Sequence, residues 1–459
     1  MGKAVTWTVR LEAIDAEGRV VETSEMVSIS RDLKKPTGAD FGLKLSEGKA
    51  VLERLQTRIT QRQVDDASAM SRCCVACGSP RPIHDYQTRT TQTLFGKTVV
   101  RLPRFRRCNC QSGRPNRSIR CALDQLLPGR TTPELDIVLA ELGALHSFRE
   151  AARILKLFLP TSGMSNHIAV RSCLGRVAEQ IEVRDSKAPY RMSRITQGPV
   201  SVFIDGTYVR AVPGFQTRHF EVVMGRLEAS GRRPSHFATM PNVKTARHQT
   251  ISACLRTQGW LPGREIVIFS DGDPSLADAV RHAASSNVVH ILDWFHVSMR
   301  VQHLRQCCRS LVKADDAGQF EFQFAARDLD QMRAKLWCGK VTTARWLLCA
   351  AAGELRRVDR KQHSRRVVAK IDRLAQMIIE FDRYLEINQP SMPNYAKRSL
   401  QGLPVSSSRA ESSANGLVNR RMNKRRQMRW SPQGAQRVLQ TRVALLDGRL
   451  QDGRFSLAA

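Results

Sequence analysis

Residues 266–276, IVIFSDGDPSL, place two aspartates directly after an apolar run. The run at 266–270 is apolar on both faces, which indicates a strand in the centre of a sheet. Asp273 precedes Pro274 and an amphipathic helix, so the sequence predicts a helix N-cap followed by proline at the first helical position. Asp271 has no such role. As a carboxylate at the end of a buried strand, before the turn at Gly272, it requires a cation.

The segments on either side of this stretch predict an α/β fold. Three strand-like runs, PVSVFIDGTYVRAV, RHFEVVMGRLEAS and PSHFATMP, precede a helical segment, TARHQTISACLRTQG. After residues 266–276 comes a further buried strand, NVVHILDWFH. This order predicts a mixed sheet covered by helices. The pattern at 297–387 is nearly all helical, and a Pro/Ser-rich link then leads to a basic helix and a last one after WSPQG.

Two further acids are candidates to work with Asp271. Asp205 ends the first strand of this region at a glycine turn, and functional carboxylates converge at strand ends in open sheets. Such a pair in a basic protein suggests Mg²⁺ bound for phosphodiester chemistry, which normally needs a third carboxylate. Glu411 is the single acid in residues 388–446. Its spacing from Ser408 also fits a capping box, and the two roles are compatible.

The twelve cysteines divide into a cluster and scattered single residues. A CxxC pair and a CxC pair flank the strand-like segment TLFGKTVVRLPRFR, and they comprise Cys74, Cys77, Cys108 and Cys110. Two tight pairs at the ends of a short hairpin predict one structural Zn²⁺, as in a zinc ribbon. Cys73 or Cys121 are alternative ligands, and a redox CxxC is the alternative function. The scattered cysteines indicate reduced thiols in a cytosolic protein.

The charge of the chain points to a polyanionic partner. Lys and Arg number 73 against 42 acids, a formal net charge of +31. A chain this basic repels itself, so nucleic acid is the first candidate partner and a membrane surface the weaker one. No apolar stretch approaches the ~20 residues that span a bilayer, and the first residues lack the apolar core of a signal peptide. We therefore expect no membrane association.

Two helical regions are candidates for DNA contact. Residues 134–182 are helical by pattern. Within them, SFREAARILKLFLPTSGMSNHIAVRSCLGRV (147–177) gives a helix, a Pro/Thr/Ser/Gly break and a second helix, which is the layout of a helix-turn-helix but also of a plain helix pair. A basic run further on would repel itself without a polyanion, so we expect it to contact DNA phosphates, with a solvated helix face as the alternative. Its cations are Arg420, Arg421, Lys424, Arg425, Arg426 and Arg429.

Four segments together resemble a known family in their order and spacing: FIDGTYV, IVIFSDGDPSL, ILDWFHVSMRVQHL and SSSRAESSANGLVNRRMNKRRQMRWSPQGAQRVLQTR. They are similar to segments of the DDE transposases of bacterial insertion sequences, in particular the group related to Mutator elements. The likeness covers about residues 71–445. It implies an RNase H-like catalytic domain with flanking helices and a large helical insertion, preceded by a zinc ribbon and a helical DNA-binding region.

The resemblance also implies roles for particular residues. Asp205, Asp271 and Glu411 would form the catalytic triad and hold two Mg²⁺ or Mn²⁺ ions. Asp293 and His296 match the (C/D)xxH motif of Mutator-like enzymes, with aspartate in place of cysteine. Because cysteine is missing, we expect a structural hydrogen bond from His296 to Asp293 rather than a zinc site.

The implied activity is binding of the element's ends, followed by metal-dependent DNA strand cleavage and strand transfer into target DNA. Pairing of two DNA ends implies a homodimer or higher oligomer, located in a bacterial cytoplasm at the nucleoid. One alternative is a catalytically inactive, transposase-derived DNA-binding protein. Another is a different RNase H-like nuclease such as a resolvase, which would use four carboxylates and lack the long helical insertion.

The predicted domains follow this scheme. They are an N-terminal hairpin and helix (1–70), a zinc-ribbon-like module (71–125), a helix-turn-helix-like region (130–190), a catalytic core (195–300 and 401–430), a helical insertion (301–400), and a C-terminal helix and tail (431–459).

Overall fold

A computed structural model of the 459-residue chain describes most of the sequence. The described residues are 4–32, 38, 41–106, 108, 110, 129–160, 166–187, 198–240, 247–284, 288–312, 322–406, 415–422 and 428–450. They fall into two compact units, Met1–Lys187 with Gln440–Ala459, and Ala188–Leu439. Within the described residues, no helix combines the length and the low polarity needed to cross a bilayer.

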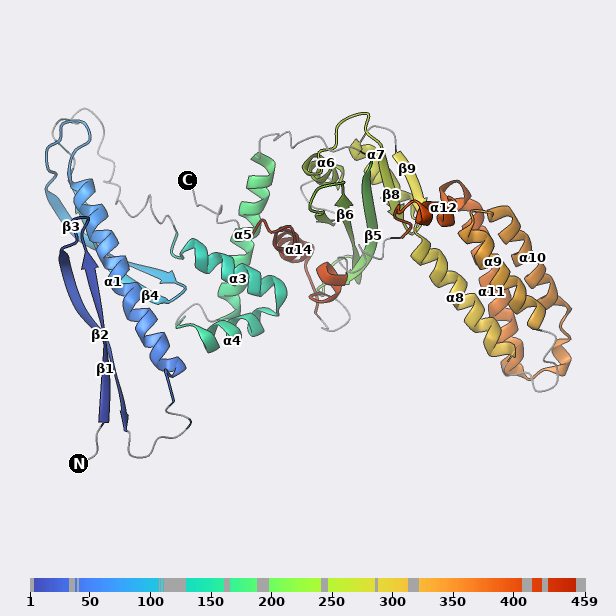
Figure 1. The fold of residues 1–459 in the computed structure, drawn as a ribbon, viewed down its shortest axis with the longest axis horizontal. Helices are drawn as coiled ribbons and strands as arrows, with labels where there is room; N and C mark the ends of the chain where they lie inside the picture. The colour runs from blue at the N-terminus through green and yellow to red at the C-terminus, as the bar shows by residue number, and fades with distance from the viewer. Residues whose placement is uncertain are drawn as a thin grey trace. The chain divides into compact units, whose positions relative to one another are not determined.

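The first unit begins with two antiparallel hairpins and a long helix that contacts both of them (Figure 1). Its elements are β1 (Ala4–Ile14), β2 (Val20–Asp32), α1 (Leu45–Arg72), β3 (Ile83–Thr93) and β4 (Gly96–Phe105). Alternate residues of β4 are buried, and Val100 and Leu102 pack with Val64 of α1. One face of the β3–β4 hairpin therefore rests on α1.

Three helices and the end of the chain complete the first unit. They are α3 (Pro133–Leu145), α4 (Phe148–Phe158), α5 (His167–Lys187) and the last turns of α14 (Pro432–Leu446). Leu139, Leu155, Val177 and Ala444 share their apolar core. The helices predicted within 134–182 are α3, α4 and α5, and the predicted pair at 147–177 corresponds to α4 and α5. Residues 161–165 between α4 and α5 lie outside the described part.

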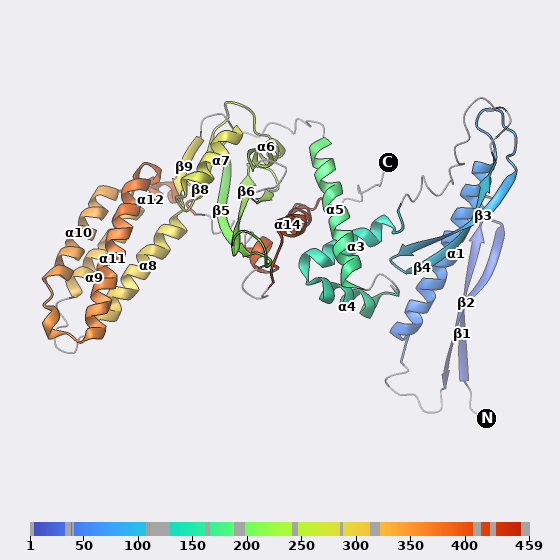
Figure 2. The same cartoon turned by 180° about the vertical axis from the view of Figure 1, so that it is seen from behind.

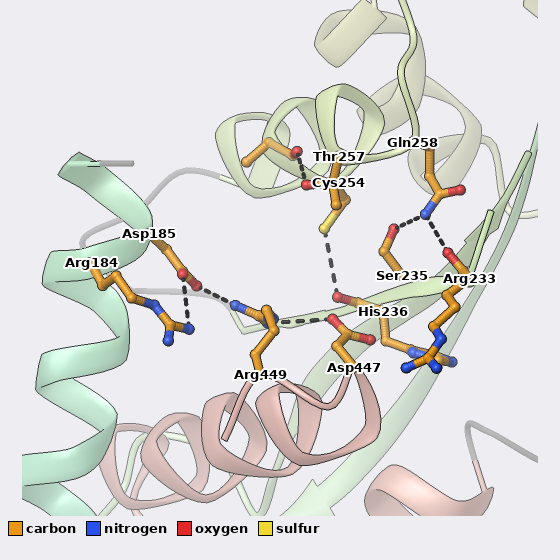
Figure 3. Close-up of polar contacts among 11 residues, drawn as sticks. Arg184, Asp185, Arg233, Ser235, His236, Cys254, Thr257, Gln258, Asp447 and Arg449 are labelled. Atoms are coloured by element: carbon orange, nitrogen blue, oxygen red, sulfur yellow. Dashed lines mark hydrogen bonds and ion pairs between the residues drawn. The ribbon is translucent and has the colours of Figure 1, made fainter. Parts of the chain in front are cut away.

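An ion-pair network links the residues directly after α14 to α5. The Arg449 guanidinium lies 2.8 Å from an Asp185 carboxylate oxygen and 3.4 Å from one of Asp447, as Figure 3 shows. Arg184 lies 3.5 Å from the second Asp185 oxygen. These contacts, together with Ala444 in the core, explain why residues after Gln440 belong to the first unit.

The second unit contains a five-stranded mixed sheet, as the sequence predicts. Its strands are β5 (Val200–Arg210), β6 (His219–Glu228), β7 (Ser235–Thr239), β8 (Ile266–Ser270) and β9 (Val288–Leu292). Their order is β7-β6-β5-β8-β9. Neighbours in the first three are antiparallel, whereas β5, β8 and β9 are parallel to one another. The chain is thus α/β with a mixed sheet.

Helices cover one face of this sheet through the even-numbered residues of its central strands. Val202, Ile204 and Ile268 belong to a buried cluster with α6 (Arg247–Thr257) and α7 (Pro274–Ala284). Polar contacts fix α6 to the edge strand β7. The Gln258 side-chain amide, one residue after α6, donates to Ser235 Oγ at 3.1 Å and to the Arg233 carbonyl at 2.9 Å (Figure 3).

The odd-numbered residues face a long helical region, in which α8–α11 run side by side in both views (Figures 1 and 2). Phe203, Phe269 and Ile291 share one buried cluster with these helices. The elements are α8 (Trp294–Val312), α9 (Gln323–Trp337), α10 (Val341–Arg357), η3 (Arg360–Gln362), α11 (Arg365–Asn388), η4 (Gln389–Ser391) and α12 (Tyr395–Leu400). Helix α8 begins directly after β9, slightly before the predicted start of the insertion.

The chain then returns to the sheet. After the short π-helix η5 (Asn415–Asn419), Trp430 pairs in parallel with Ala211, the residue that follows β5. Its N–H donates to the Arg210 carbonyl at 2.9 Å, and its carbonyl accepts from the Val212 N–H at 3.0 Å. Residues on both sides of the helical region therefore belong to one unit.

Candidate active site and metal centre

Three aspartates occupy equivalent positions on the three parallel strands. Register pairs Phe203 with Phe269, and Phe269 with Ile291. Each of these residues is followed two positions later by an aspartate, namely Asp205, Asp271 and Asp293. Asp271 and Asp293 directly follow β8 and β9, but Asp205 lies inside β5, which continues to Arg210 in its pairing with β6. The prediction that Asp205 ends its strand at a glycine turn is therefore wrong. Because side chains alternate across a strand, the aspartates continue the same face and the same row. Neighbouring strands lie about 4.8 Å apart, so the backbones of these three aspartates, the aspartate row, lie side by side. Among the described residues, only the four cysteines have ligand atoms already gathered at metal-binding spacing.

The surroundings of Asp205 favour a cation. Burial raises the pKa of the Asp205 carboxyl, because a charged group loses hydration there. His296 lowers that pKa, whereas the negative charges of Asp271 and Asp293 raise it. All three groups are thus near enough to act on Asp205. A divalent cation would relieve both the burial penalty and the mutual repulsion, and carboxylate oxygens suit Mg²⁺.

The two aspartates of SDGDP differ as the sequence predicts. Asp273 Oδ1 accepts the Ser275 N–H at 2.9 Å, and α7 begins at Pro274, so the predicted N-cap is confirmed. Asp273 is exposed. Asp271 Oδ1 accepts the Asp273 N–H at 3.1 Å, which holds the carboxylate in the turn. Within the described part of the chain, Asp271 Oδ2 has no hydrogen-bond partner and remains open to a ligand.

Asp293 has a structural role that the sequence indicated only in part. Its side chain is 1% exposed, and Oδ1 accepts the Phe295 N–H at 2.8 Å, which caps α8. His296 Nε2 lies 3.9 Å from Asp293 Oδ2. This separation is too long for a hydrogen bond, so the predicted hydrogen bond is wrong. The cap uses Asp293 Oδ1, so His296 and the Phe295 N–H face different oxygens of the carboxylate.

The helical region braces the turn that carries Asp271. Tyr384 of α11 donates its hydroxyl to the Asp271 carbonyl at 2.8 Å, and the Arg300 guanidinium lies 4.2 Å from the Tyr384 ring centre. Gly272 has φ +101°, and a Cβ there would lie 2.8 Å from Asn388 Oδ1. The turn is therefore tightly enclosed by α11. Sequence reasoning missed these residues, because nothing local to Tyr384 or Asn388 signals a partner 113 positions away.

The ends of the neighbouring strands are held in the same way. Tyr395 of α12 donates to the Leu292 carbonyl at 2.8 Å, directly before Asp293. His290 of β9 bridges Ser270 Oγ and Ser391 Oγ, with each ring nitrogen 2.8 Å from a hydroxyl oxygen. Burial raises the pKa of Tyr384 and of Tyr395, so both hydroxyls remain protonated donors. The helical region thus positions the edge of the sheet that carries the aspartate row.

The predicted third carboxylate, Glu411, lies outside the described residues, as do Lys424, Arg425 and Arg426 of the basic run. Arg420 and Arg429 are described and exposed.

Arg421 differs from its neighbours, because its side chain is fully buried and its guanidinium lies 4.9 Å from the Trp430 ring centre. The prediction that Arg421 contacts DNA is therefore wrong. A stretch this rich in cations gives no local signal for which one turns inward.

The predicted zinc ligands gather in the first unit. The ligand atoms of Cys74, Cys77, Cys108 and Cys110 all lie within 4.8 Å of one another. Cys74 Sγ lies 3.6 Å from Cys110 Sγ, and Cys77 Sγ lies 3.2 Å from Cys108 Sγ. Cys73 is exposed and does not belong to the group, and Cys121 lies outside the described residues. These four sulfurs form a site that could hold one Zn²⁺.

The electrostatics of the four-cysteine cluster fit a cation. Backbone N–H groups of Ala76 and Cys77 lower the pKa of the Cys74 thiol to about 6, since they stabilise the thiolate. Contacts with the neighbouring thiols raise the pKa of Cys110 to about 12. Four thiolates at this spacing repel one another unless a cation is shared between them, which is the condition a structural Zn²⁺ meets.

Comparison with known proteins gives only weak similarity. No protein-family model matches the sequence, and no curated protein matches it. Among solved structures, the chain is similar to the Drosophila P element transposase strand transfer complex, with a TM-score of 0.24 and 14% sequence identity, over 70% of this chain and 81% of that chain. A TM-score this low does not establish a shared fold.

Proposed function

We propose that this protein is a DDE-type transposase with an RNase H-like catalytic domain. The observation that carries the proposal is the register of β5 and β8, which places Asp205, inside β5, level with Asp271, directly after β8, at the point where the parallel pairing of the two strands stops. The net charge of +31 supports a DNA substrate. Glu411 completes the proposed triad, on the resemblance of its segment to the DDE transposases.

The proposed site would hold two Mg²⁺ or Mn²⁺ ions on Asp205, Asp271 and Glu411. When bound, such ions activate a water for attack on the phosphodiester and stabilise the leaving 3′-oxygen. The chain's own contribution is positional. The Asp273 N–H holds one Asp271 oxygen and leaves the other open, while Tyr384 fixes the backbone behind it. After cleavage, the freed 3′-OH would attack target DNA in the strand-transfer step.

Other parts of the chain would bind the element's ends. The consecutive helices α4 and α5 are the candidates for the helix-turn-helix. Arg420 and Arg429 are exposed cations suited to phosphate contact. Arg421 is left out because it is buried. Since two ends must be held together for strand transfer, we propose a homodimer or higher oligomer on DNA.

The helical region favours a transposase over a resolvase. Among the described residues, the five α-helices α8–α12 follow β9 before the chain returns to the sheet at Trp430. A resolvase-like nuclease would lack such an insertion. Asp293 would be its fourth carboxylate, but the hydrogen bond to the Phe295 N–H and the 1% exposure of its side chain assign Asp293 to capping α8.

The test is strand cleavage and joining by the purified protein. Labelled DNA carrying the ends that flank the coding sequence is incubated with Mg²⁺, and the wild type is compared with Asp271→Asn. Loss of a metal ligand removes several kcal/mol of transition-state stabilisation, so the rate should fall at least about 100-fold.

Asp273→Asn is the matched control, two positions away in the same turn. Asparagine caps a helix about as well as aspartate, so this variant should retain activity. A wild type that binds DNA but neither cuts nor joins it would favour the inactive DNA-binding alternative. Equal loss of activity in the two folded variants would refute the separate roles of Asp271 and Asp273.

A further inference from the structure

The β3–β4 hairpin has one covered face and one open face. Residues 98, 100 and 102 of β4 are buried, and two of them pack against α1, whereas the residues between them are exposed. Register places Thr88 opposite Arg101 and Thr90 opposite Val99. The exposed side chains form the outer ribbon face, which comprises Tyr86, Thr88, Thr90, Lys97, Val99 and Arg101.

The cations of the outer ribbon face are not engaged by acids. The Arg101 guanidinium lies 4.2 Å from the centre of the Tyr86 ring, whose residue is 50% exposed. Among the described residues, neither Arg101 nor Lys97 makes an ion pair. Arg104, three positions further along β4, instead pairs with Asp85, which raises the pKa of the Arg104 guanidinium. Two cations and an aromatic ring thus face solvent together on a polar strand pair.

The outer ribbon face is also held rigid. Cys74 and Cys77 precede β3, and Cys108 and Cys110 follow β4, so the four-cysteine cluster closes the open end of the hairpin. At the other end, the Gln92 N–H donates to the Arg130 carbonyl at 2.7 Å. A binding surface gains affinity when its geometry is fixed before the ligand arrives.

From these features we infer that the outer ribbon face binds duplex DNA. The inference rests on the proposed function for its choice of DNA as the partner. A two-stranded β-ribbon fits the major groove, and cations beside hydroxyl and aromatic side chains suit phosphate and sugar contacts. Lys97 and Arg101 contact phosphates, and Tyr86 holds the Arg101 guanidinium in place.

The experiment compares two double variants of the full chain that lose the same charge. Lys97→Gln/Arg101→Gln neutralises the outer ribbon face. Arg62→Gln/Arg104→Gln neutralises two exposed cations that are already paired, with Asp66 and Asp85. Binding to a duplex carrying the element's end is measured without divalent metal at several salt concentrations, with the matching single strand as a second ligand.

The face variant should bind the duplex about tenfold more weakly, and the slope of log affinity against log salt should fall by about two, one unit per lost phosphate contact. The control variant should change both quantities much less. Retained zinc and an unchanged melting curve show that the face variant is folded, and Tyr86→Ala should weaken binding less than the double variant.

Equal affinities and equal salt slopes of the face and control variants would refute the inference. A face variant that binds the single strand more weakly but the duplex normally would also refute it. Cleavage by the wild type is measured separately, with Mg²⁺. A protein that binds through this face yet never cuts would keep the inference and reject the transposase. If the wild type cuts DNA while the face variant binds DNA normally, the transposase proposal stands and the inference is rejected. A wild type that does not bind DNA would reject both proposals.

Discussion

The four-cysteine cluster and the aspartate row both contain acidic groups near one another, but the fold brings these groups together in different ways. Each is proposed to bind a cation, which would relieve the repulsion among its acidic groups. The cysteines come in two tight pairs at the ends of one hairpin, so local geometry suffices to bring them together. The aspartates come from separate strands, and only parallel pairing of β5, β8 and β9 aligns them.

This difference has a consequence for stability. Closing a hairpin of moderate length has a small entropic cost, and bound metal then supplies most of the local folding energy. The aspartate row has the opposite dependence. Its geometry is set by the sheet and by α11 and α12, so a cation adds to a structure that already exists. The predictions below test that contrast, from the largest expected effect to the smallest.

Loss of zinc should have the largest effect, and a local one. Cys77→Ser or chelation should unfold the module around β3 and β4, because structural zinc contributes about 10–16 kcal/mol in small zinc modules. Zinc content and mapped protease cleavage within residues 71–110 provide the measurement. Cys73→Ser is the control and should keep one zinc per chain, since Cys73 lies outside the cluster. Wild-type protein purified without zinc would contradict the proposed centre.

The turn of the aspartate row should respond to a single methyl group. Gly272→Ala places a Cβ 2.8 Å from Asn388 Oδ1 at φ +101°, and the combined strain and crowding should cost about 1–3 kcal/mol. Gly263→Ala is the matched control, because Gly263 has φ +91° but no atom within 4 Å of its Cβ. Thermal melting compares the two. Equal destabilisation would mean that α11 does not enclose the turn.

Two tyrosine variants separate bracing of the site from stability alone. Tyr384→Phe and Tyr395→Phe each remove one buried hydroxyl that donates to a strand-end carbonyl, at a cost of about 1 kcal/mol. Both should lower the melting temperature by a few degrees. Only Tyr384→Phe should also raise the Mg²⁺ concentration needed for strand cleavage, because its acceptor belongs to Asp271. The same Mg²⁺ dependence in both variants would remove the special role of Tyr384.

The smallest effect should be the pH dependence of the metal-free fold. Burial raises the pKa of Asp205, so the folded protein binds a proton there more tightly than the unfolded chain does. In chelator, this carboxyl should therefore add stability as the pH falls from neutral toward the ordinary aspartate pKa. Asp205→Asn should be more stable than the wild type at neutral pH and lack that gain. Melting curves at several pH values give the measurement.

Added Mg²⁺ should stabilise the wild type but not Asp205→Asn, since the variant loses a ligand. A wild type whose melting temperature changes neither with pH nor with added Mg²⁺ would contradict the proposal that Asp205 is a metal ligand.

Local patterns predicted several features of the fold and of the site correctly. The buried run before Asp271, the N-cap at Asp273, the strands of the mixed sheet and the two cysteine pairs were each predicted from residues near one another in the chain. Arg421 and the His296–Asp293 contact were predicted wrongly, because a burial direction and a distance depend on packing partners far along the chain. Tyr384 was missed for the same reason.

The sequence alone determined which groups carry charge and which segments are strands, helices or turns, because hydrophobic period and turn residues act over a few positions. It also separated the capping aspartate from the unexplained one. Only the tertiary structure decided which carboxylates share a row, which helix encloses their turn and which arginine is buried. Those outcomes depend on strand register and on contacts between residues over a hundred positions apart, such as Tyr384 and Asp271, which no local pattern encodes.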